Sequence, residues 1–422
     1  MCSASQFQAT PLDCTLIAKE MLNDKKQSPA RRWVKPGLSL LALIFVVHFF
    51  VASFPAREKG SDFPEFYAAA RMVLEGQGHR LYDPSAQEAF QIRYAGRIGT
   101  YFIHPPFEAL IYLPFALLPL NAAYALWSSF NAGLLVVLAM LLSKYVLRTP
   151  SWPFVLALFF LFPPVLLNFF EGQDALLLLL LVTATFLTLK QKNDIAAGCF
   201  LACGLFKFHL IIALVVLVFC LRRVRTLITF AMGIGFAILL SVGICGPKIF
   251  ASYSQLLTQI SGLPLAAIHP AQMANLRGLV AMCGLGGREG FVITLVLSLA
   301  TVLLPVFLVG GTAPRNTPQF DLMAAAFLLA TLLVSYHVIP HDFTLLLLPL
   351  ALVVRHLIDT KDISAWLRFG MIAIGAVLFL PPLHIILMFR QLYGLTSIPV
   401  ICLFLCICWE LRRITKEGPA IA

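Results

Sequence analysis

Five short clusters of polar side chains interrupt the apolar sequence. They occupy residues 61–67, 168–174, 206–209, 269–278 and 336–342. A carboxylate can take a proton from a hydroxyl group, and lysine or arginine can hold a phosphate. The clusters therefore have the residue types needed to transfer a group from a phosphate-bearing substrate, if the fold brings them together.

The first cluster contains Asp62, an acidic residue shortly after a long apolar run. Two roles are open to it: a catalytic carboxylate, or the N-cap of a helix, with Glu65 three residues later completing a capping box. Apolar residues at helical spacing follow, so we predict an amphipathic helix lying in the membrane interface. The local sequence favours capping. Asp83, further along the same loop, is predicted to be a turn residue rather than a catalyst.

The second and third clusters interrupt apolar runs. Glu171, Gln173 and Asp174 suggest either a tight polar hairpin or a site for sugar or acceptor hydroxyl groups. An ionisable residue within the membrane thickness is costly unless it faces a polar cavity or a partner, and Lys207 is such a residue. We predict that Lys207 binds a phosphate, whereas His209 fits a packing role equally well.

The last two clusters carry one arginine, two histidines and an aspartate. Arg277 is either a bidentate phosphate ligand or a solvated loop residue. His337, His341 and Asp342 are close enough in sequence to suggest a metal site, but Pro340 disrupts the spacing that would align the imidazoles. Contact with phosphate or support of a catalytic base is therefore preferred, and no metal is expected. The isolated histidines are predicted to have packing or interface roles: His48, His104 and His384.

The composition places the chain in a membrane. Of its 422 residues, 60% are hydrophobic and 12% are charged, and the mean hydropathy is +0.88. One soluble core cannot hide so much apolar surface, so the bilayer must act as its solvent. We predict an all-α polytopic membrane protein. Its basic pI of 9.3 then reflects the orientation of its loops, and nucleic-acid binding is not implied.

The chain is predicted to form one domain between two cytoplasmic tails. Residues 1–36 and 412–422 are the tails, because each is polar and basic beside an apolar run. Residues 37–411 form a single transmembrane catalytic domain, whose largest external loops lie at about 56–104 and 246–290. Loops of this length between membrane helices usually carry function.

One apolar stretch is too long for a single span and has the wrong flanks. Residues 195–221 lie between two basic clusters, which should both be cytoplasmic. Two half-length helices that meet at Lys207 satisfy this requirement. The prediction becomes about 12 membrane segments, including this broken helical hairpin, with the whole net charge of +11 on the cytoplasmic side.

Several short motifs, in their order and their shared external location, resemble glycosyltransferase family 87. This family belongs to the C-type superfamily and contains polyprenyl-phosphate-mannose-dependent mannosyltransferases of bacteria. The matching motifs are Ser61-Asp62-Phe63 with Phe66-Tyr67, Leu81-Tyr82-Asp83, Pro105-Pro106-Phe107 with Pro114 and Leu118-Pro119, Trp127 and Asn131, Glu171-Gly172-Gln173, Asn275-Leu276-Arg277-Gly278, and His337 with His341-Asp342.

The resemblance implies roles for these residues. Asp62 would be the catalytic carboxylate. The donor phosphate would be bound by residues of the hairpin and of two later segments: Lys207, Arg277, His341 and His337. Sugar or acceptor contacts are assigned to Glu171, Gln173, Asp174, Asn275, Asp342 and Tyr67. Two departures from the family pattern are Lys207-Phe208, where members often carry Lys-Pro, and His341, where tyrosine is also common.

We therefore expect an inverting glycosyltransferase in the bacterial cytoplasmic membrane, with its active site on the external side. The expected donor is a polyprenyl-phosphate sugar, with mannose suggested by the family alone. The acceptor is a glycolipid, a polysaccharide or a protein. No cofactor is expected, and membrane lipids surround the protein. The alternative is a transporter or lipid flippase, because broken helices with charged tips at mid-membrane are also a transporter device.

Overall fold

The computed structural model describes residues 61–259, 270–309 and 313–417, and this part of the chain contains helices and no strand. The α-helices are α3 (Phe63–Leu74), α4 (Pro84–Ala95), α5 (Ala109–Ala116), α6 (Leu120–Leu141), α7 (Trp152–Phe160), α8 (Pro163–Glu171), α9 (Ala175–Lys190), α10 (Asp194–Cys203), α11 (Ile212–Cys220), α12 (Val224–Cys245), α13 (Ile249–Gln259), α14 (Leu276–Met282), α15 (Gly287–Val309), α16 (Pro318–Val334), α17 (Leu347–Asp359), α18 (Ala365–Phe379), α19 (Pro381–Phe389) and α20 (Ser397–Glu417). The 3-10 segments that matter for the site are η3 (Pro106–Glu108), η5 (Gly204–Leu210) and η8 (Pro340–Leu346).

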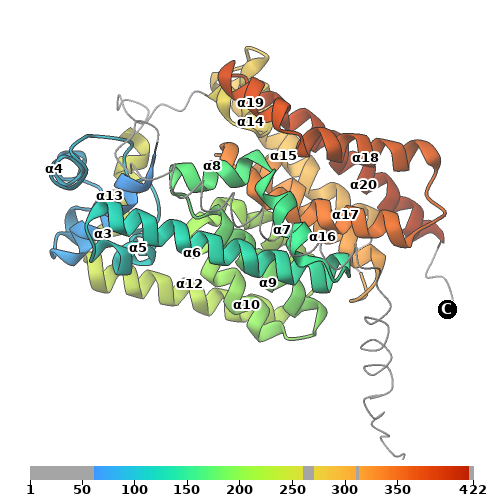
Figure 1. The fold of residues 1–422 in the computed structure, drawn as a ribbon, viewed down its shortest axis with the longest axis horizontal. Coiled ribbons are helices and arrows are strands. Elements are labelled where there is room, and N and C mark those ends of the chain that lie inside the picture. Colours follow the sequence, from blue (N-terminus) through green and yellow to red (C-terminus); the bar gives the residue numbers. More distant parts are fainter. Residues whose placement is uncertain (1–60, 260–269, 310–312, 418–422) are drawn as a thin grey trace, which may run out of the picture.

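Long apolar helices run along the long axis of the molecule, and α3, α4 and α13 gather at one end of it (Figure 1). Within the described residues, five helices are long and apolar enough to cross a membrane, or up to seven if each of two bent pairs counts as one span. Three further apolar helices are shorter. An all-helical protein with several helices that could cross a membrane is therefore confirmed for the described residues, while the predicted total of about 12 segments is not reached by length and composition. The predicted first span, 37–54, lies outside the described residues.

The broken hairpin is present. Lys207, at φ −113° and ψ 56°, interrupts the helical path between α10 and α11. The stretch also returns to the end where it began, because the Thr226 hydroxyl at the start of α12 donates to the Asp194 carbonyl at the start of α10 (3.0 Å). The length and flanking charges of this stretch thus gave the correct local fold, and Lys207 is at its tip.

Helix α3 forms where the amphipathic helix was predicted, but it does not lie on a surface. Nine of its twelve residues are buried, Glu65 among them. It packs against α4 and α5, so its polar positions are enclosed by the loop that follows it. The helical spacing was read correctly from the sequence, whereas the burial of the polar face depends on residues 84–116, which are distant in sequence.

The capping interpretation of Asp62 is wrong, and that of Asp83 is confirmed. Asp62 stands at the N-cap of α3, yet its side chain makes no capping hydrogen bond there. Asp83 does cap its helix, because its Oδ1 accepts from the backbone N–H groups of Ser85 (3.0 Å) and Ala86 (3.3 Å). The Asp62 carboxylate is therefore free for another role.

Candidate active site

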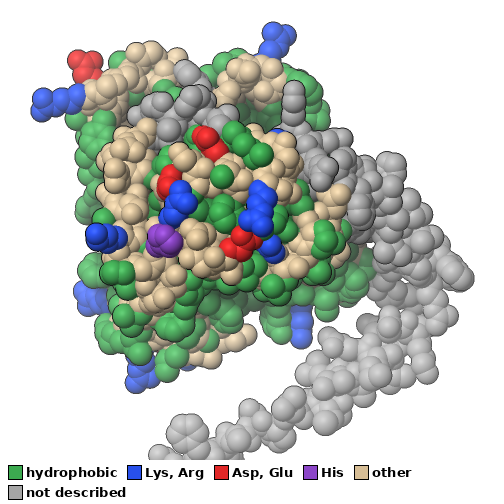
Figure 2. Space-filling view, turned by 90° about the vertical axis from the view of Figure 1, so that its left-hand side faces the viewer, with side chains coloured by type: hydrophobic (Ala, Val, Ile, Leu, Met, Phe, Trp, Pro, Cys, Tyr) green, Lys and Arg blue, Asp and Glu red, His purple; other side chains and the backbone are tan. Residues whose placement is uncertain are grey.

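All five polar clusters contribute to one cavity of about 550 Å³. Figure 2 looks onto the end of the molecule where α3 and α4 lie, and acidic, basic and histidine side chains gather around the centre of this face. The lining residues that matter most for the chemistry come from α3 and its N-cap, the α8–α9 turn, η5 and η8. The cavity is lined by Asp62, Glu65, Thr100, Tyr101, Ile103, His104, Pro105, Glu171, Gln173, Phe206, Lys207, Phe208, His209, Tyr253, Gln272, Tyr336, His337, Ile339, Pro340, His341, Asp342, Met388, Gln391 and Tyr393.

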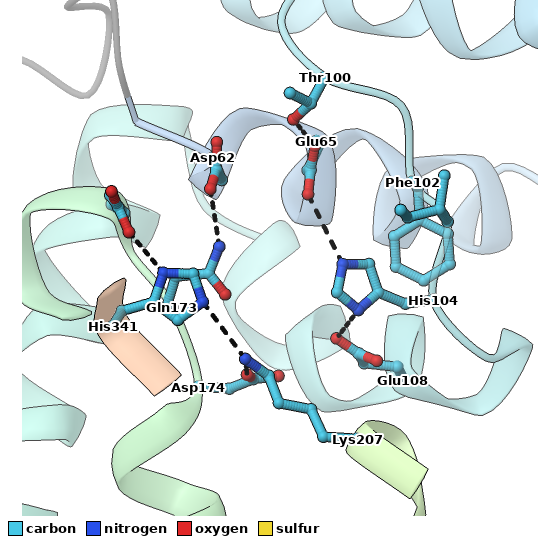
Figure 3. A network of polar contacts seen from close by, with 12 residues as sticks. Asp62, Glu65, Thr100, Phe102, His104, Glu108, Gln173, Asp174, Lys207 and His341 are labelled. Atoms are coloured by element: carbon cyan, nitrogen blue, oxygen red, sulfur yellow. Dashed lines mark hydrogen bonds and ion pairs between the residues drawn. The ribbon is translucent and has the colours of Figure 1, made fainter. Parts of the chain in front are cut away.

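Asp62 is held against the end of α8. Its backbone N–H donates to the Glu171 carbonyl (3.0 Å), and the Gln173 amide Nε2 donates to its Oδ2 (2.7 Å), as Figure 3 shows. Burial raises the pKa of the Asp62 carboxyl to about 6, and the neighbouring Glu171 carboxylate adds to this, while His341 and the Gln173 amide act in the opposite direction. A carboxylate with a pKa near 6 is mostly ionised at neutral pH and is a better proton acceptor than an exposed aspartate.

Lys207 is buried among carboxylates at the hairpin tip. Its side chain is 4% exposed, and its Nζ lies 2.9 Å from Asp342 Oδ1 and 3.1 Å from Asp174 Oδ1. The ammonium donates a hydrogen bond to Asp342 and forms an ion pair with Asp174. Its third neighbour is His341, whose Nε2 is 3.5 Å away.

His341 connects this lysine to Glu171. Its Nδ1 lies 2.5 Å from Glu171 Oε2, and its Nε2 faces Lys207 (Figure 3). An ionised carboxylate only accepts hydrogen bonds, so the Nδ1 carries the proton that Glu171 accepts. The imidazole is thereby fixed in position between the Glu171 carboxylate and the buried Lys207 ammonium.

A second group of titratable side chains escaped the sequence analysis. The Thr100 hydroxyl donates to Glu65 Oε2, His104 Nε2 lies 3.8 Å from Glu65 Oε1, and His104 Nδ1 lies 2.9 Å from Glu108 Oε1 (Figure 3). Burial raises the pKa of Glu65 to about 8, so this carboxyl is mostly protonated at neutral pH. Two carboxyl groups one helical turn apart thus hold different protonation states at neutral pH, with Asp62 mostly ionised and Glu65 mostly protonated.

Several predicted site residues lie elsewhere or have another function. Tyr67 turns away and donates to the Leu118 carbonyl (2.7 Å). Asn275 caps α14 by accepting from Gly278 N–H (2.7 Å) and also donates to the Ser335 carbonyl, so both ends of its amide already have a backbone partner. Arg277 is exposed, does not line the cavity and donates to the carbonyl of Tyr336, which does. Asn275 and Arg277 thus hold the chain at Ser335 and Tyr336 beside the cavity, whereas Tyr67 lines a different cavity.

The histidines divide between the site and the core. His209 and His337 line the cavity, and burial lowers the pKa of His337 to about 4, so its imidazole is neutral at physiological pH. A neutral imidazole can donate one hydrogen bond to a phosphate but cannot offset its charge. His384 has the predicted packing role, between the Tyr393 hydroxyl and the Leu378 carbonyl. His48 lies outside the described residues.

Helix α6 fixes the turn that carries Glu171 and Gln173. The Trp127 indole N–H donates to the Gly172 carbonyl (2.8 Å), and the Tyr124 hydroxyl donates to the Phe169 carbonyl (2.8 Å). Gly172 itself has φ +72°, and a Cβ at this position would lie 2.6 Å from the Cβ of Phe63. The turn therefore needs glycine for two reasons, conformation and close approach to α3.

We expect Gly172→Ala to destabilise the protein by more than Gly96→Ala. Both glycines have nearly the same positive φ, and the left-handed conformation costs alanine about 1–2 kcal/mol. Only position 172 has a neighbour within contact distance, which adds about 1–3 kcal/mol of overpacking. Thermal unfolding of the two variants in the same detergent measures the difference. Equal losses of stability would show that α3 moves away freely and that the turn is not fixed against it.

Comparisons with known proteins identify one family. The family model of glycosyltransferase family 87 matches residues 102–336, which is more than half of the chain. The match includes the α8–α9 turn and Lys207, while Asp62 and the segment of His341 lie outside it. No curated protein and no solved structure matches the chain.

Proposed function

The chain belongs to glycosyltransferase family 87, and we propose from this that it transfers a sugar, with mannose as the first candidate, from a polyprenyl-phosphate donor to an acceptor hydroxyl group. The active site would be the cavity at the α3 end, on the external face of the membrane, with both tails in the cytoplasm. Family membership also favours a transferase over the transporter that the broken hairpin alone would allow.

The observation that carries this proposal is the placement of Asp62. It is an ionisable carboxylate in the same cavity as the buried Lys207 and His341. Transfer from a lipid-linked sugar phosphodiester needs a base for the acceptor hydroxyl and positive or hydrogen-bonding groups for the departing phosphate. Asp62 would supply the base. Lys207, with His341 beside it, would supply the phosphate contact.

The reaction would be a single displacement. The acceptor oxygen gives its proton to Asp62 and forms a bond to the anomeric carbon, while the bond from that carbon to the phosphate oxygen breaks and the electron pair leaves with the lipid phosphate. The base and the leaving group must lie on opposite sides of the sugar, so the anomeric configuration would be inverted. Glu65, protonated at neutral pH, would offer a hydrogen bond to a sugar or acceptor oxygen.

The charges around Lys207 affect how a phosphate could be bound. Asp174 and Asp342 already neutralise this lysine, and Glu171 adds another carboxylate next to His341. A bound phosphodiester adds one more negative charge to this group. We therefore expect the Lys207 ammonium to make the direct contact to the phosphate, with His341 beside it holding the ammonium in position.

The donor is tested with the purified protein in lipid nanodiscs. Candidate donors are polyprenyl phosphates carrying mannose, glucose or arabinose, and the matching nucleotide sugars serve as the comparison. Total membrane lipid and a soluble oligosaccharide are offered as acceptors. Release of polyprenyl phosphate together with sugar transfer supports the proposal, and transfer from nucleotide sugars alone would contradict it.

The acid limb of the pH profile should depend on Asp62. Transfer needs the ionised carboxylate, so kcat/KM is expected to fall as the pH decreases through about 6. Glu171→Gln removes a charge that raises the Asp62 pKa, so the limb should move to lower pH. Gln173→Leu removes a hydrogen bond that lowers this pKa, so the limb should move to higher pH. Shifts in the same direction, or none, would mean that another group controls the limb.

A further inference from the structure

A second cavity, of about 410 Å³, shares no lining residue with the active-site cavity. Tyr67 and Arg71 line it from α3, and Arg93 and Tyr94 line it from the end of α4. Residues 117–121, at the junction of α5 and α6, complete its walls. We refer to this cavity as the arginine pocket, because its only charged lining residues are the two arginines.

Both guanidinium groups of the arginine pocket contact the same tyrosine. The Cζ of Arg71 lies 4.4 Å from the centroid of the Tyr94 ring, and the Cζ of Arg93 lies 5.1 Å from it. The Glu75 carboxylate accepts from Arg71 Nη2 (3.1 Å) and from Arg93 Nη1 (3.0 Å). One carboxylate offsets only one of the two cations, so the group keeps a positive charge.

Arg93 has donors to spare, whereas Arg71 is held by its neighbours. Arg71 Nη1 donates to the Ala116 carbonyl (3.1 Å), and its Nη2 donates to Glu75 and Tyr94. Among the described residues, Arg93 hydrogen-bonds only through Nη1, and its side chain is 64% exposed. Its Nε and Nη2 form one edge of the guanidinium, and such an edge fits two oxygens of a phosphate. An oxyanion is therefore the class of ligand that this pocket can take.

The arginine pocket lies at the start of a helix that could cross a membrane. Residues 120–147, which begin with α6, form one of the five candidate spans, and the first two of them line the pocket. Leu117 is 70% exposed beside it, and Leu126 and Phe130 are exposed two to three turns into α6. Arginine and tyrosine at the end of a span, next to exposed apolar side chains, are expected at the depth of the lipid headgroups.

We propose that the arginine pocket binds the phosphate group of an anionic phospholipid. The phosphate would accept hydrogen bonds from the free edge of Arg93, and the acyl chains would lie along the exposed apolar residues of α6. The positive charge of the group favours a lipid with a net negative charge over a zwitterionic one. A dissolved phosphate ion offers the same oxygens but would use none of the apolar surface beside the pocket. The proposal does not depend on the sugar or its donor, because the pocket is separate from the active-site cavity.

The first test measures lipid binding by native mass spectrometry of the purified full chain in detergent, titrated with a short-chain phosphatidylglycerol. Arg93→Gln removes the charge and the free edge, and it should weaken binding about tenfold, as expected for one charge-assisted contact. Arg80→Gln is the matched control, because Arg80 is also exposed and also pairs with one carboxylate, but does not line the pocket. It should bind like the wild type. Equal affinities for the two variants would overturn the proposal.

Glu75→Gln should act in the opposite direction. It removes the negative charge that competes with a phosphate for both arginines, while the glutamine oxygen can still accept hydrogen bonds from them. Binding of phosphatidylglycerol should become about two- to fivefold tighter, the size of one partly exposed charge interaction. Weaker binding by this variant would mean that the charge of the arginines does not attract the lipid, and would contradict the proposal.

Two competing ligands identify the source of the phosphate. Phosphatidylcholine of the same chain length carries a phosphate without net charge, and inorganic phosphate carries one without acyl chains. Neither should displace phosphatidylglycerol from the wild-type protein at equal concentration. Displacement by phosphatidylcholine would show that the apolar contacts alone hold the lipid. Displacement by inorganic phosphate would show a site for a dissolved anion. Either result would overturn the assignment to an anionic lipid.

Discussion

Asp62→Asn is expected to lower kcat about 10²–10⁴-fold, the range that a positioned general base contributes. Asparagine keeps the size of the side chain and still offers an oxygen to Gln173, so the fold of this region should persist. It cannot accept a proton from the acceptor hydroxyl. The measurement is the rate of polyprenyl phosphate release by the purified variant at saturating donor and acceptor.

The matched control is Asp83→Asn. Asp83 belongs to the same loop region, but its carboxylate caps α4, and asparagine caps a helix about as well. Its turnover should stay close to that of the wild type. If Asp62→Asn kept more than a tenth of the wild-type rate, Asp62 would not be the base, and Glu171 would become the next candidate because it lies beside Asp62 in the same cavity.

Lys207→Met is expected to destabilise the protein by about 3–5 kcal/mol and to abolish transfer. The substitution leaves Asp174 and Asp342 buried without a countercharge, and an uncompensated buried charge is strongly destabilising. Lys190→Met is the matched control. Lys190 pairs with Asp321 at the end of α9, where the two side chains are 16% and 22% exposed, so water can stabilise the remaining charge and the loss should be smaller. Unfolding in detergent is followed for both variants.

A triple variant separates the stability of this cluster from its chemistry. Lys207→Met combined with Asp174→Asn and Asp342→Asn removes all three charges at once, so most of the lost stability should return. Transfer should not return, because the phosphate contact is gone. A triple variant that unfolds as easily as Lys207→Met would contradict the ion-pair explanation, and one that transfers sugar normally would show that Lys207 does not bind the donor.

The sequence identified the polar residues of the site better than the residues that enclose them. The break at Lys207 could be predicted from the local sequence, because a long apolar stretch between two basic clusters cannot cross the membrane only once. The five clusters could be found because a polar residue within apolar sequence is unusual. The spacing of the clusters in the sequence does not show that all five contribute to one cavity, because this depends on the fold.

What escaped prediction depends on contacts between distant residues. Glu65 was assigned to a helix cap because an aspartate stands three residues before it, and its burial comes from the loop of residues 99–108. A usable signal existed in the four-residue spacing of His104 and Glu108, but prolines and apolar residues between them hid it. Tyr67 and Asn275 were placed in the site because they belong to the matching motifs. In the structure, both side chains donate hydrogen bonds to backbone carbonyls instead.

The predicted number of spans illustrates a further limit. Hydropathy identifies apolar runs, but it does not show where a run bends or stops short of crossing. The α7–α8 and α18–α19 pairs bend sharply, and α9 and α16 are shorter than a full span. A count of apolar runs in the sequence is therefore not a count of membrane spans.

The anomeric configuration of the product tests whether the sugar passes in one displacement from the lipid phosphate to a hydroxyl group deprotonated by Asp62. With a donor of known anomeric configuration, the new glycosidic linkage is identified by its one-bond carbon–proton coupling in an NMR spectrum. A single displacement gives the opposite configuration in the product. Retention would require a glycosyl-enzyme intermediate or a different reaction path, and would contradict the role given to Asp62.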